Sequence, residues 1–314
     1  MKASIVVCTR DRCASLKTLL SSVADADARA MNLDLLVVDD GSRDATVETV
    51  TSFAKAAEFP VVLLHQPRRG LAVARNRGLR AARGDLIIFL DDDCVISRNY
   101  FQEAAARFAG EDAPVLRGGR VELGDPADAP LTIRTSPEVE RLCAHGDPGG
   151  FILGCNMAVT RAATRLIGPF DERFGPGALL RSAEDTDYVL RALLAGVRVE
   201  YVPDMTVYHH HGRRSSEAID RVHRDYEIGN GGLTMKHAVH APWLWRPRYW
   251  TARNAIREMF GGPQFDPVLH LSHAPIVAHH AIGACLFAYS KIRKLAPWSE
   301  PGDSELTQAP AGVV

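Results

Sequence analysis

The stretch Asp85–Asp93 reads DLIIFLDDD, so three consecutive carboxylates follow directly on an apolar run. A continuous apolar run without polar alternation is typical of a parallel strand that is covered on both faces. Three neighbouring carboxylates at the end of such a strand repel one another when they are partly desolvated. They are either solvated acids in a turn, or they need a counter-charge such as a divalent cation.

Three more apolar runs alternate with helical segments before residue 110. The apolar runs are SIVVCT (4–9), LDLLVVDD (33–40) and VVLLH (61–65), and helices are expected at Ala14–Ala24, Asp44–Ala57 and Leu71–Ala82. These runs also lack polar alternation, which predicts parallel strands buried on both faces. Strands and helices that alternate in this way form an open α/β sheet, whose ligands bind beyond the carboxyl ends of the strands. We therefore expect CTRDR, VDDGS and DDD at one edge.

The composition is that of an ordinary globular protein. The 314 residues are 46% hydrophobic and 24% charged with a formal net charge of -1, which gives no reason to expect nucleic-acid binding. The six cysteines are scattered without a C-x-x-C pair, which argues against a disulfide framework or a zinc knuckle. This cysteine pattern fits a reducing compartment. The apolar run at the N-terminus is too short for a signal peptide, so a cytoplasmic location is expected.

The strand–helix alternation breaks after Pro114. Strands are expected at 115–123, 149–160 and 197–203, a loop at 124–148, and helices at 182–196 and from about Ser215. We divide the chain into a domain at 1–235 with halves at 1–110 and 111–235, a helical C-terminal region at 236–296, and a tail at 297–314 that is expected to be disordered.

The acid triplet at 91–93 is the strongest candidate for a metal site. Oxygen-rich clusters of this kind suit Mg²⁺ or Mn²⁺, which also bridge the oxygens of a diphosphate. The motif TVYHHHG (206–212) could add an imidazole, because strand alternation points His209 and His211 to one side and His210 to the other. The three histidines are either one metal-facing ligand with its neighbours or a polar loop.

The other strand ends carry residues that suit a nucleotide. In VVDDGSRDAT (37–46), Asp39 and Asp40 either hydrogen-bond a ribose or base, or form an Asx turn with Ser42 capping the next helix. The basic helix that begins after Gly70 could receive a phosphate at its N-terminus. The polar residues that either face this ligand or are solvated are Arg10, Arg12, Arg75, Asn76 and Arg80.

The motif SAEDTDYVLRALL (182–194) has two interpretations. Ser182 and Asp185 have the spacing of a capping box, which would only start a helix. Alternatively, Glu184 or Asp185 is a general base that a fixed helix start aims into the site. Spacing alone does not separate the two.

Together, these motifs resemble those of the family-2 inverting glycosyltransferases. The segments that carry the resemblance, in the order seen in that family, are VVCTRDR (6–12), VVDDGSRD (37–44), GLAVARNRGL (70–79), FLDDD (89–93), GCNMAV (154–159), EDTDYVLR (184–191) and VYHHHG (207–212). The resemblance runs from residue 3 to about residue 235. It implies a GT-A type fold: a Rossmann-like, mostly parallel sheet with helices on both faces, a nucleotide-binding half and an acceptor-binding half.

The resemblance also implies roles for single residues. Residues implied to bind the nucleotide sugar are Thr9, Arg10, Arg12, Asp40, Arg75, Asn76, Asp91 and Asp92. Asp91 and Asp93 match the D-x-D of the family, which implies Asp93, Asp91 and His209 as metal ligands, with Asp93 favoured as the direct one and Asp91 nearer the ribose and sugar, although the triplet leaves open which acid binds metal directly. Asp185 matches the catalytic base, with Glu184 beside it, and Asn156 and Met157 would lie by the donor sugar and the acceptor.

The reaction implied is a metal-assisted single displacement that moves a sugar from a nucleotide-diphosphate donor to an acceptor hydroxyl. UDP-sugars are favoured, and dTDP-rhamnose is the alternative donor. The acceptor is a glycan, a lipid-linked glycan or a small natural product. A sugar nucleotidyltransferase is disfavoured because CTRDRCAS (8–15) lacks a glycine- and lysine-rich loop, and a non-catalytic nucleotide-sugar binding protein is disfavoured by the acids at 93 and 185.

The region 243–295 combines aromatic, basic and apolar residues. Its segment APIVAHHAIGACLFAYS (274–290) is interrupted by two histidines and is interpreted as a buried or interfacial helix rather than a membrane span. Trp, Tyr and Arg suit a membrane interface, which would place the protein peripherally on the inner face of the membrane. The alternatives are helices that pack on the core and a homodimer contact.

Overall fold

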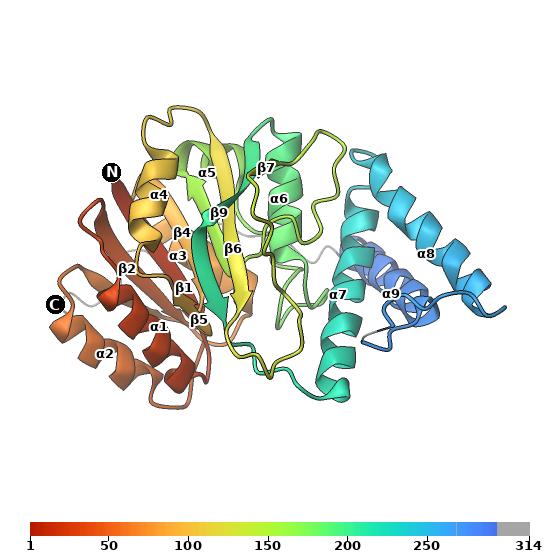
Figure 1. Ribbon diagram of the computed structural model, residues 1–314, viewed down its shortest axis with the longest axis horizontal. Helices are drawn as coiled ribbons and strands as arrows, with labels where there is room; N and C mark the ends of the chain where they lie inside the picture. The colour runs from red at the N-terminus through yellow and green to blue at the C-terminus, as the bar shows by residue number, and fades with distance from the viewer. Residues whose placement is uncertain (268, 294–314) are drawn as a thin grey trace.

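The strands expected before residue 110 form one half of a mixed sheet (Figure 1). The computed structural model describes residues 1–267 and 269–293, so the tail predicted at 297–314 lies outside the described residues. Within the described part, the sheet has nine strands in the order β3-β2-β1-β4-β8-β6-β9-β5, with β7 beside β9. The strands are β1 (Lys2–Thr9), β2 (Asn32–Asp39), β3 (Val61–His65), β4 (Leu86–Asp91), β5 (Cys94–Ile96), β6 (Val115–Leu123), β7 (Glu140–Arg141), β8 (Asn156–Thr160) and β9 (Arg198–His209).

Helices cover both faces of this sheet (Figure 1). They are α1 (Cys13–Asp25), α2 (Thr46–Ala56), α3 (Leu71–Ala81), α4 (Tyr100–Phe108), α5 (Arg161–Ile167) and α6 (Glu184–Leu194). One core packs beneath α1 and α4 and the other beneath α3, α5 and α6. Successive residues of β1 point into different cores, Ile5 and Val7 into the first and Val6 into the second, which is why its sequence is apolar throughout.

The prediction of burial on both faces is wrong for VVLLH. This segment is β3, which lies at the end of the sheet and pairs only with β2 among the described strands. Its Val62 is 42% exposed, and none of its residues is fully buried. An apolar run does not show where its strand falls in the strand order, so an edge strand and a central one look alike in sequence.

β9 joins most of two segments that the sequence suggested separately, as RVEYVP (198–203) and TVYH (206–209). It runs parallel to β6, with a register shift between Gly119 and Arg120, and its last residues pair antiparallel with β5. In that pairing Cys94 lies opposite His209. Because β5 follows the acid triplet directly, the register brings His209 to Asp93. The strand predicted at 149–160 begins only at 156, since the preceding residues form turns.

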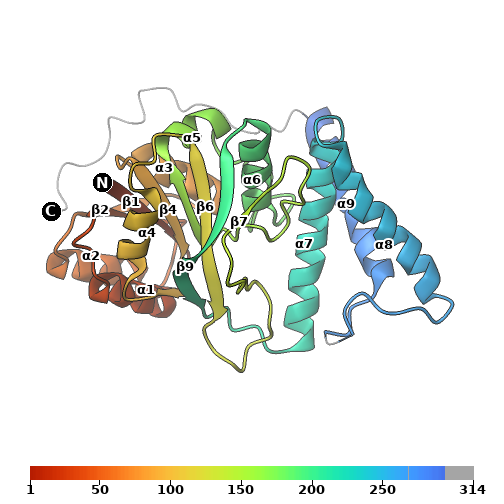
Figure 2. The ribbon, with the colours of Figure 1, turned by 45° about the horizontal axis from the view of Figure 1, so that its top comes forward.

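Four further helical elements lie beyond the sheet: α7 (Ser216–Lys236), the 3₁₀ turn η1 (Pro242–Leu244), α8 (Trp245–Glu258) and α9 (His273–Ile292). Figure 2 shows α7 standing between the sheet domain and the pair α8 and α9. No helix in the described part of the chain combines the length and apolarity that crossing a membrane requires.

α7 and α9 approach each other through glycines. A Cβ atom on Gly231 would lie 2.1 Å from the carbonyl oxygen of His280, and one on Gly283 would lie 1.9 Å from the carbonyl oxygen of Ile228. Both distances are far shorter than van der Waals contact, so only glycine fits at these two positions. A buried ion pair between Glu227 of α7 and His280 of α9 adds to this contact, which we call the glycine seam.

Candidate active site

A cavity of about 750 Å³ opens at the carboxyl ends of β1, β2 and β4, the edge at which the sequence predicts a ligand. This volume is typical of small-molecule sites. The predicted site residues that line the cavity are Thr9, Arg10, Arg12, Asp40, Arg75, Asp91, Asp92, Asp93, Glu184, Asp185 and His209. Six segments that are distant in sequence therefore meet in one place.

The protein itself supplies part of the counter-charge for the acid triplet. Arg12 donates to both neighbours, at 3.0 Å to Oδ1 of Asp92 and 2.7 Å to Oδ2 of Asp93, and the Thr9 hydroxyl donates to Asp92 at 2.7 Å. Burial raises the pKa of Asp92 to about 6; the charge of Arg12 opposes this shift and that of Asp93 adds to it. Both oxygens of Asp92 thus accept from protein donors, whereas the hydrogen bonds from Arg75 and Arg12 use one oxygen each of Asp91 and Asp93, which are the acids with an oxygen left for a ligand.

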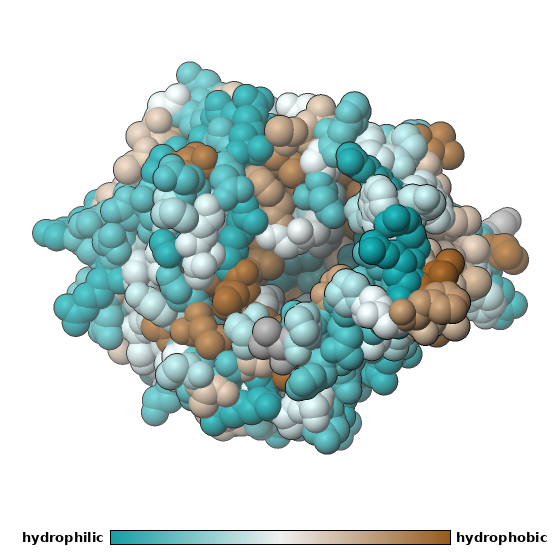
Figure 3. Space-filling model, turned by 45° about the vertical axis from the view of Figure 1, so that its right-hand side comes forward, coloured by the Kyte–Doolittle hydropathy of each residue, from teal (hydrophilic) through white to brown (hydrophobic). Residues whose placement is uncertain are grey.

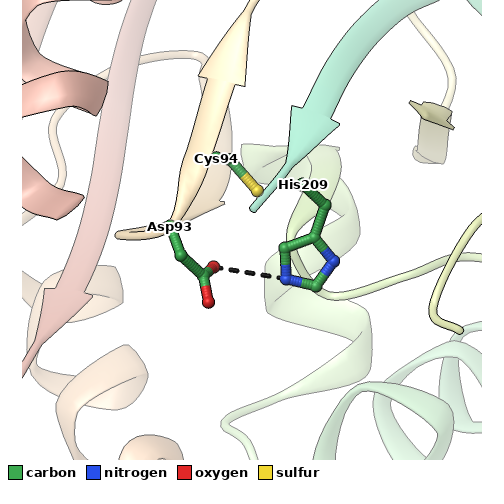
Figure 4. A group of neighbouring side chains, drawn as sticks. All are labelled: Asp93, Cys94 and His209. Atoms are coloured by element: carbon green, nitrogen blue, oxygen red, sulfur yellow. Dashed lines mark ion pairs between the residues drawn. The ribbon is translucent and has the colours of Figure 1, made fainter. Parts of the chain in front are cut away.

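Asp93 and His209 form a buried ion pair, with Oδ1 and Nε2 3.2 Å apart (Figure 4). Burial alone would raise the pKa of Asp93, but the contact with His209 and the charges of His209 and Arg12 outweigh it and lower the pKa to about 2. Burial alone would lower the pKa of His209, but the same contact raises it to about 9. Without a metal, the imidazolium is therefore the counter-charge of Asp93.

The donor atoms at this point fit a hard divalent cation. Asp93, Cys94 and His209 place an oxygen, a sulfur and a nitrogen within 4.8 Å of one another. Mg²⁺ and Mn²⁺ prefer carboxylate oxygen to thiol sulfur, and contact with Cys155 together with burial holds the pKa of the Cys94 thiol well above its usual range. Asp93 and His209 are therefore the fitting ligands, and the partly exposed Asp91 lies on the cavity side.

Arg75 connects the acid triplet to the acids of α6. Its guanidinium donates at 2.9 Å to Asp91 and at 2.9 Å to Glu184, and it also contacts the carbonyl of Gly154. Burial raises the pKa of Glu184 to about 7; the charge of Asp185 adds to this shift and that of Arg75 opposes it. Arg75 is therefore a buried cation of the cavity wall and not a solvated helix residue.

Asp185 faces the cavity and does not form a capping box. The residue before α6, Ala183, has a left-handed backbone with φ of 68° and no side chain caps the helix. The Ser182 hydroxyl donates instead to the carbonyl of Asp225 at 2.8 Å. The carboxylate of Asp185 accepts from the backbone N–H of Gly154 at 2.9 Å and from its own helix. The capping-box interpretation is therefore wrong.

Asp39 and Asp40 have different surroundings. Asp39 accepts from the backbone N–H of Ser42 at 2.9 Å, which makes the Asx turn. Asp40 lines the cavity and accepts from the N–H groups of Arg69 and Gly70 at 2.8 and 2.9 Å. The next N–H, that of Leu71, donates to a backbone carbonyl, so the start of α3 does not offer these donors to a phosphate.

Three predicted site residues lie away from the cavity. The amide of Asn76 both donates to and accepts from the backbone of Phe170. The amide of Asn156 donates to two backbone carbonyls and accepts from a buried tyrosine hydroxyl, and Met157 is fully buried in the core. Residues 154–155 line the cavity in their place. Arg80, a further candidate on the basic helix α3, is exposed and lies outside the cavity lining.

The far wall of the cavity comes from residues that no sequence pattern singled out. They are Thr132, Arg181, Arg213, Asp225 and Tyr226. Arg181 pairs with Asp225 at 3.1 Å, and the hydroxyl groups of Thr132 and Tyr226 lie 3.2 Å apart. Among these residues, only Arg213 had a local sequence signal for the site, since it directly follows HHHG. Thr132, Asp225 and Tyr226 reach the cavity through the way in which loop 124–148 folds against α7.

The ion pair predicts a pH dependence of stability. The pKa of His209 is raised from 6.5 to about 9, so its stabilising effect is fully present below pH 6.5 and is lost as the pH rises through about 9. The loss should amount to roughly 3 kcal/mol, since one pKa unit corresponds to about 1.4 kcal/mol. Urea unfolding of the wild type and His209→Gln, with chelator, should show a difference that shrinks over this range. The exposed His240→Gln is the control, and a pH-independent difference would contradict the prediction.

The fold and the site define the class of GT-A nucleotide-sugar transferases. The features that do so are the mixed sheet, the acid cluster at the carboxyl ends of its parallel strands, and the second half of the chain, which continues the same sheet. The family model for glycosyl transferase family 2 matches residues 4–165, and the chain belongs to this family and is a glycosyltransferase.

Similar proteins are found by both sequence and structure. Glycosyltransferase AglE of Haloferax volcanii is 23% identical over 74% of this chain and 73% of its own length. The pre-mycofactocin glycosyltransferase of Mycobacterium tuberculosis is 27% identical over 76% of this chain, which spans 48% of that protein. Among solved structures, S. aureus TarS 1-349 has a TM-score of 0.56 at 18% identity, covering 94% of this chain and 92% of that chain. Mannosyltransferase PcManGT from Pyrobaculum calidifontis, in complex with GDP-Man and Mn²⁺, has a TM-score of 0.58 at 18% identity over 94% and 80%.

Proposed function

We propose that this nucleotide-sugar glycosyltransferase works with inversion of configuration and that Asp185 is its base. The observation that supports this most directly is that two acidic groups from separate elements line one cavity. The triplet 91–93 with His209 suits a metal diphosphate, whereas Glu184 and Asp185 suit an acceptor hydroxyl. A single displacement uses both groups in one step and needs no nucleophile from the protein.

Asp185 suits the role of base better than Glu184. Glu184 is bound by Arg75 at 2.9 Å, so a proton on it would weaken that ion pair. The carboxylate of Asp185 is held in place by backbone N–H groups and keeps lone pairs that can accept a proton. In the reaction, this carboxylate takes the proton of the acceptor hydroxyl, the hydroxyl oxygen bonds to the anomeric carbon, and the bond from that carbon to the diphosphate breaks.

Asp93 and His209 would hold Mn²⁺ or Mg²⁺, with Asp91 beside them. When bound, such a cation neutralises charge on the diphosphate leaving group. His209 must lose its proton to become a ligand, and Arg12 then remains as the protein cation beside Asp93. In this arrangement, the triplet and His209 hold the diphosphate end of the donor, and the sugar of the donor lies on the side of the cavity where Asp185 is.

We propose a UDP-sugar as the donor. Support comes from TarS, which is similar to this chain in sequence as well as in structure and was solved in complex with UDP-GlcNAc. The acceptor is a hydroxyl of a glycan, a lipid-linked glycan or a small natural product. The Thr132 and Tyr226 hydroxyls and Arg213 on the far wall are the groups that it would meet.

A donor screen tests this function. Melting temperatures are measured with Mn²⁺ and UDP-, dTDP- or GDP-sugars, and the anomeric configuration of the product or of the sugar released by hydrolysis is followed by NMR. A donor at about a hundred times its dissociation constant stabilises the native state by about 2.7 kcal/mol, a rise of several degrees. We expect this rise for a UDP-sugar with Mn²⁺, its loss with chelator, and an inverted product.

Each arm of the screen has a distinct negative result. A rise with dTDP-rhamnose alone would replace the donor and keep the mechanism. A product that retains the donor configuration would contradict the single displacement. Stabilisation by nucleotide sugars without transfer or hydrolysis would point to a binding protein instead.

A further inference from the structure

The outer side of α8 leaves an unusual number of apolar side chains in solvent. No residue of α8, which is described throughout, is buried, and the turn that follows exposes 79% of Met259 and 86% of Phe260. The exposed aromatic and aliphatic side chains of this segment are Trp245, Tyr249, Trp250, Ile256, Met259 and Phe260. Large exposed apolar groups that gather on one element usually mark an interaction surface.

The outer side of α8 carries arginines but no acid. Arg246, Arg253 and Arg257 are exposed on the same side as the aromatic residues, because their spacing keeps them within one face of the helix. The single acid of the helix, Glu258, turns inward and accepts from the N–H of His273 at 2.8 Å. Arg248 also turns inward, to a hydroxyl of α7. The outer side is therefore apolar and cationic, with no acid among the exposed residues of 245–260.

We call the nine exposed residues named above the α8 face. Figure 3 turns this end of the molecule forward and shows apolar and hydrophilic side chains lying next to each other at its right-hand edge. Arg253 lies over the ring of Trp250 at 5.2 Å, so the cations and the aromatic rings are interleaved. The face lies outside residues 4–165 that match the family model, and the cavity residues do not include it.

We propose that the α8 face docks the protein on the surface of a bilayer that contains anionic lipid. Tyrosine and tryptophan rings favour the head-group level, the arginines pair with lipid phosphates, and Ile256, Met259 and Phe260 reach the acyl boundary. The helix lies in the plane of the interface, which agrees with its amphipathic pattern. This proposal does not depend on which sugar is transferred.

Charge complementarity favours the bilayer over other partners. A symmetric contact with a second copy would bring the same patch against itself. Its arginines would then face arginines, with no acid of the α8 face to pair with them. A nucleic acid would satisfy the arginines, but it would leave the apolar tip formed by Ile256, Met259 and Phe260 in water.

Vesicle flotation of the full chain tests the proposal. Vesicles of phosphatidylcholine are compared with vesicles of phosphatidylcholine and phosphatidylglycerol at low and high salt. We expect partition into the anionic vesicles, weakened by salt, and a blue shift of tryptophan fluorescence. Each arginine near an anionic surface contributes about five-fold, so the triple variant Arg246→Gln, Arg253→Gln, Arg257→Gln should lose about a hundred-fold in partition.

Matched control variants show whether partition depends on the α8 face or only on the total charge and apolar surface of the protein. Three of the exposed arginines of the sheet domain, Arg83, Arg98 and Arg165, are changed to Gln as the charge control. Ile256→Ser with Phe260→Ser is compared with Val139→Ser and Leu166→Ser, which are exposed elsewhere. We expect both α8 variants to lose partition and both controls to keep it. Circular dichroism without vesicles checks that each variant is folded.

The proposal would be overturned by any of the following results. They are no partition of the folded full chain into anionic vesicles, equal loss in the matched controls, a dimer in sedimentation that the Ile256 and Phe260 changes dissolve, and oligonucleotide binding that needs the three arginines but not Ile256 and Phe260. Equal partition into vesicles with and without phosphatidylglycerol would also contradict it, because the arginines would then have no role.

Discussion

Asp185→Asn is expected to lower the rate of sugar transfer by about 10²- to 10⁴-fold, because an amide cannot accept the proton of the acceptor hydroxyl. The change keeps the shape of the side chain and an oxygen that can still accept from the N–H of Gly154. Donor affinity should therefore stay close to that of the wild type. Calorimetric titration of the donor and initial transfer rates in the same preparation measure the two effects separately.

Two further variants decide what such a loss means. Asp220→Asn, on the exposed side of α7, controls for the loss of one negative charge. Glu184→Gln should keep more of the transfer rate, since Arg75 would retain Asp91 as a partner at 2.9 Å. If Glu184→Gln abolished transfer and Asp185→Asn did not, the base would be Glu184.

Removal of the Asp93 carboxylate is expected to cost about 10³-fold in metal-dependent turnover, since a bound cation supplies several kcal/mol of charge stabilisation. The burial of Asp93 decides which variant is best. Only 7% of the Asp93 side chain is exposed and it pairs with His209, so Asp93→Ala would leave a buried cation without its partner and would cost stability. Asp93→Asn retains volume and polarity and is the sharper test.

The measurement is turnover as a function of Mn²⁺ concentration, beside a thermal melt of each variant. Asp92→Asn is the matched comparison, because the protein's own Thr9 and Arg12 occupy that carboxylate. We expect a far smaller effect from it than from Asp93→Asn. Full activity of Asp93→Asn in the presence of chelator would remove the metal from the mechanism.

Sequence patterns were sufficient for the parallel half of the sheet and for its ligand edge. β1, β2 and β4 are buried on both faces, so their continuous apolar runs reflect a simple physical condition, and the acids that follow them must lie at one edge. The same patterns did not predict α4 or α5. They also did not predict the antiparallel entry of β8 beside β4, because strand order is set by contacts across the chain.

The candidate site was predicted less completely than the fold. Periodicity cannot show whether a polar side chain near a strand end is used by a ligand or by the backbone. Asn76 and Asn156 are used by the backbone and Asp40 is shared between its loop and the cavity. The sequence left open whether His209 belongs to a polar loop or faces a metal, and the pairing of β5 with β9 shows that its partner is Asp93.

The glycine seam also bears on how this enzyme could be recombined with others. The family match ends at residue 165, yet α7 supplies Asp225 and Tyr226 to the cavity wall and meets α9 at Gly231 and Gly283 without room for a side chain. A chimera that exchanges the acceptor side but joins the parental chains between α7 and α9 would pair two helices whose surfaces were never fitted. The junction between the two parental chains would have to precede α7, so that α7 and α9 come from the same parent. The acceptor side of the cavity would then be exchanged together with the C-terminal helices.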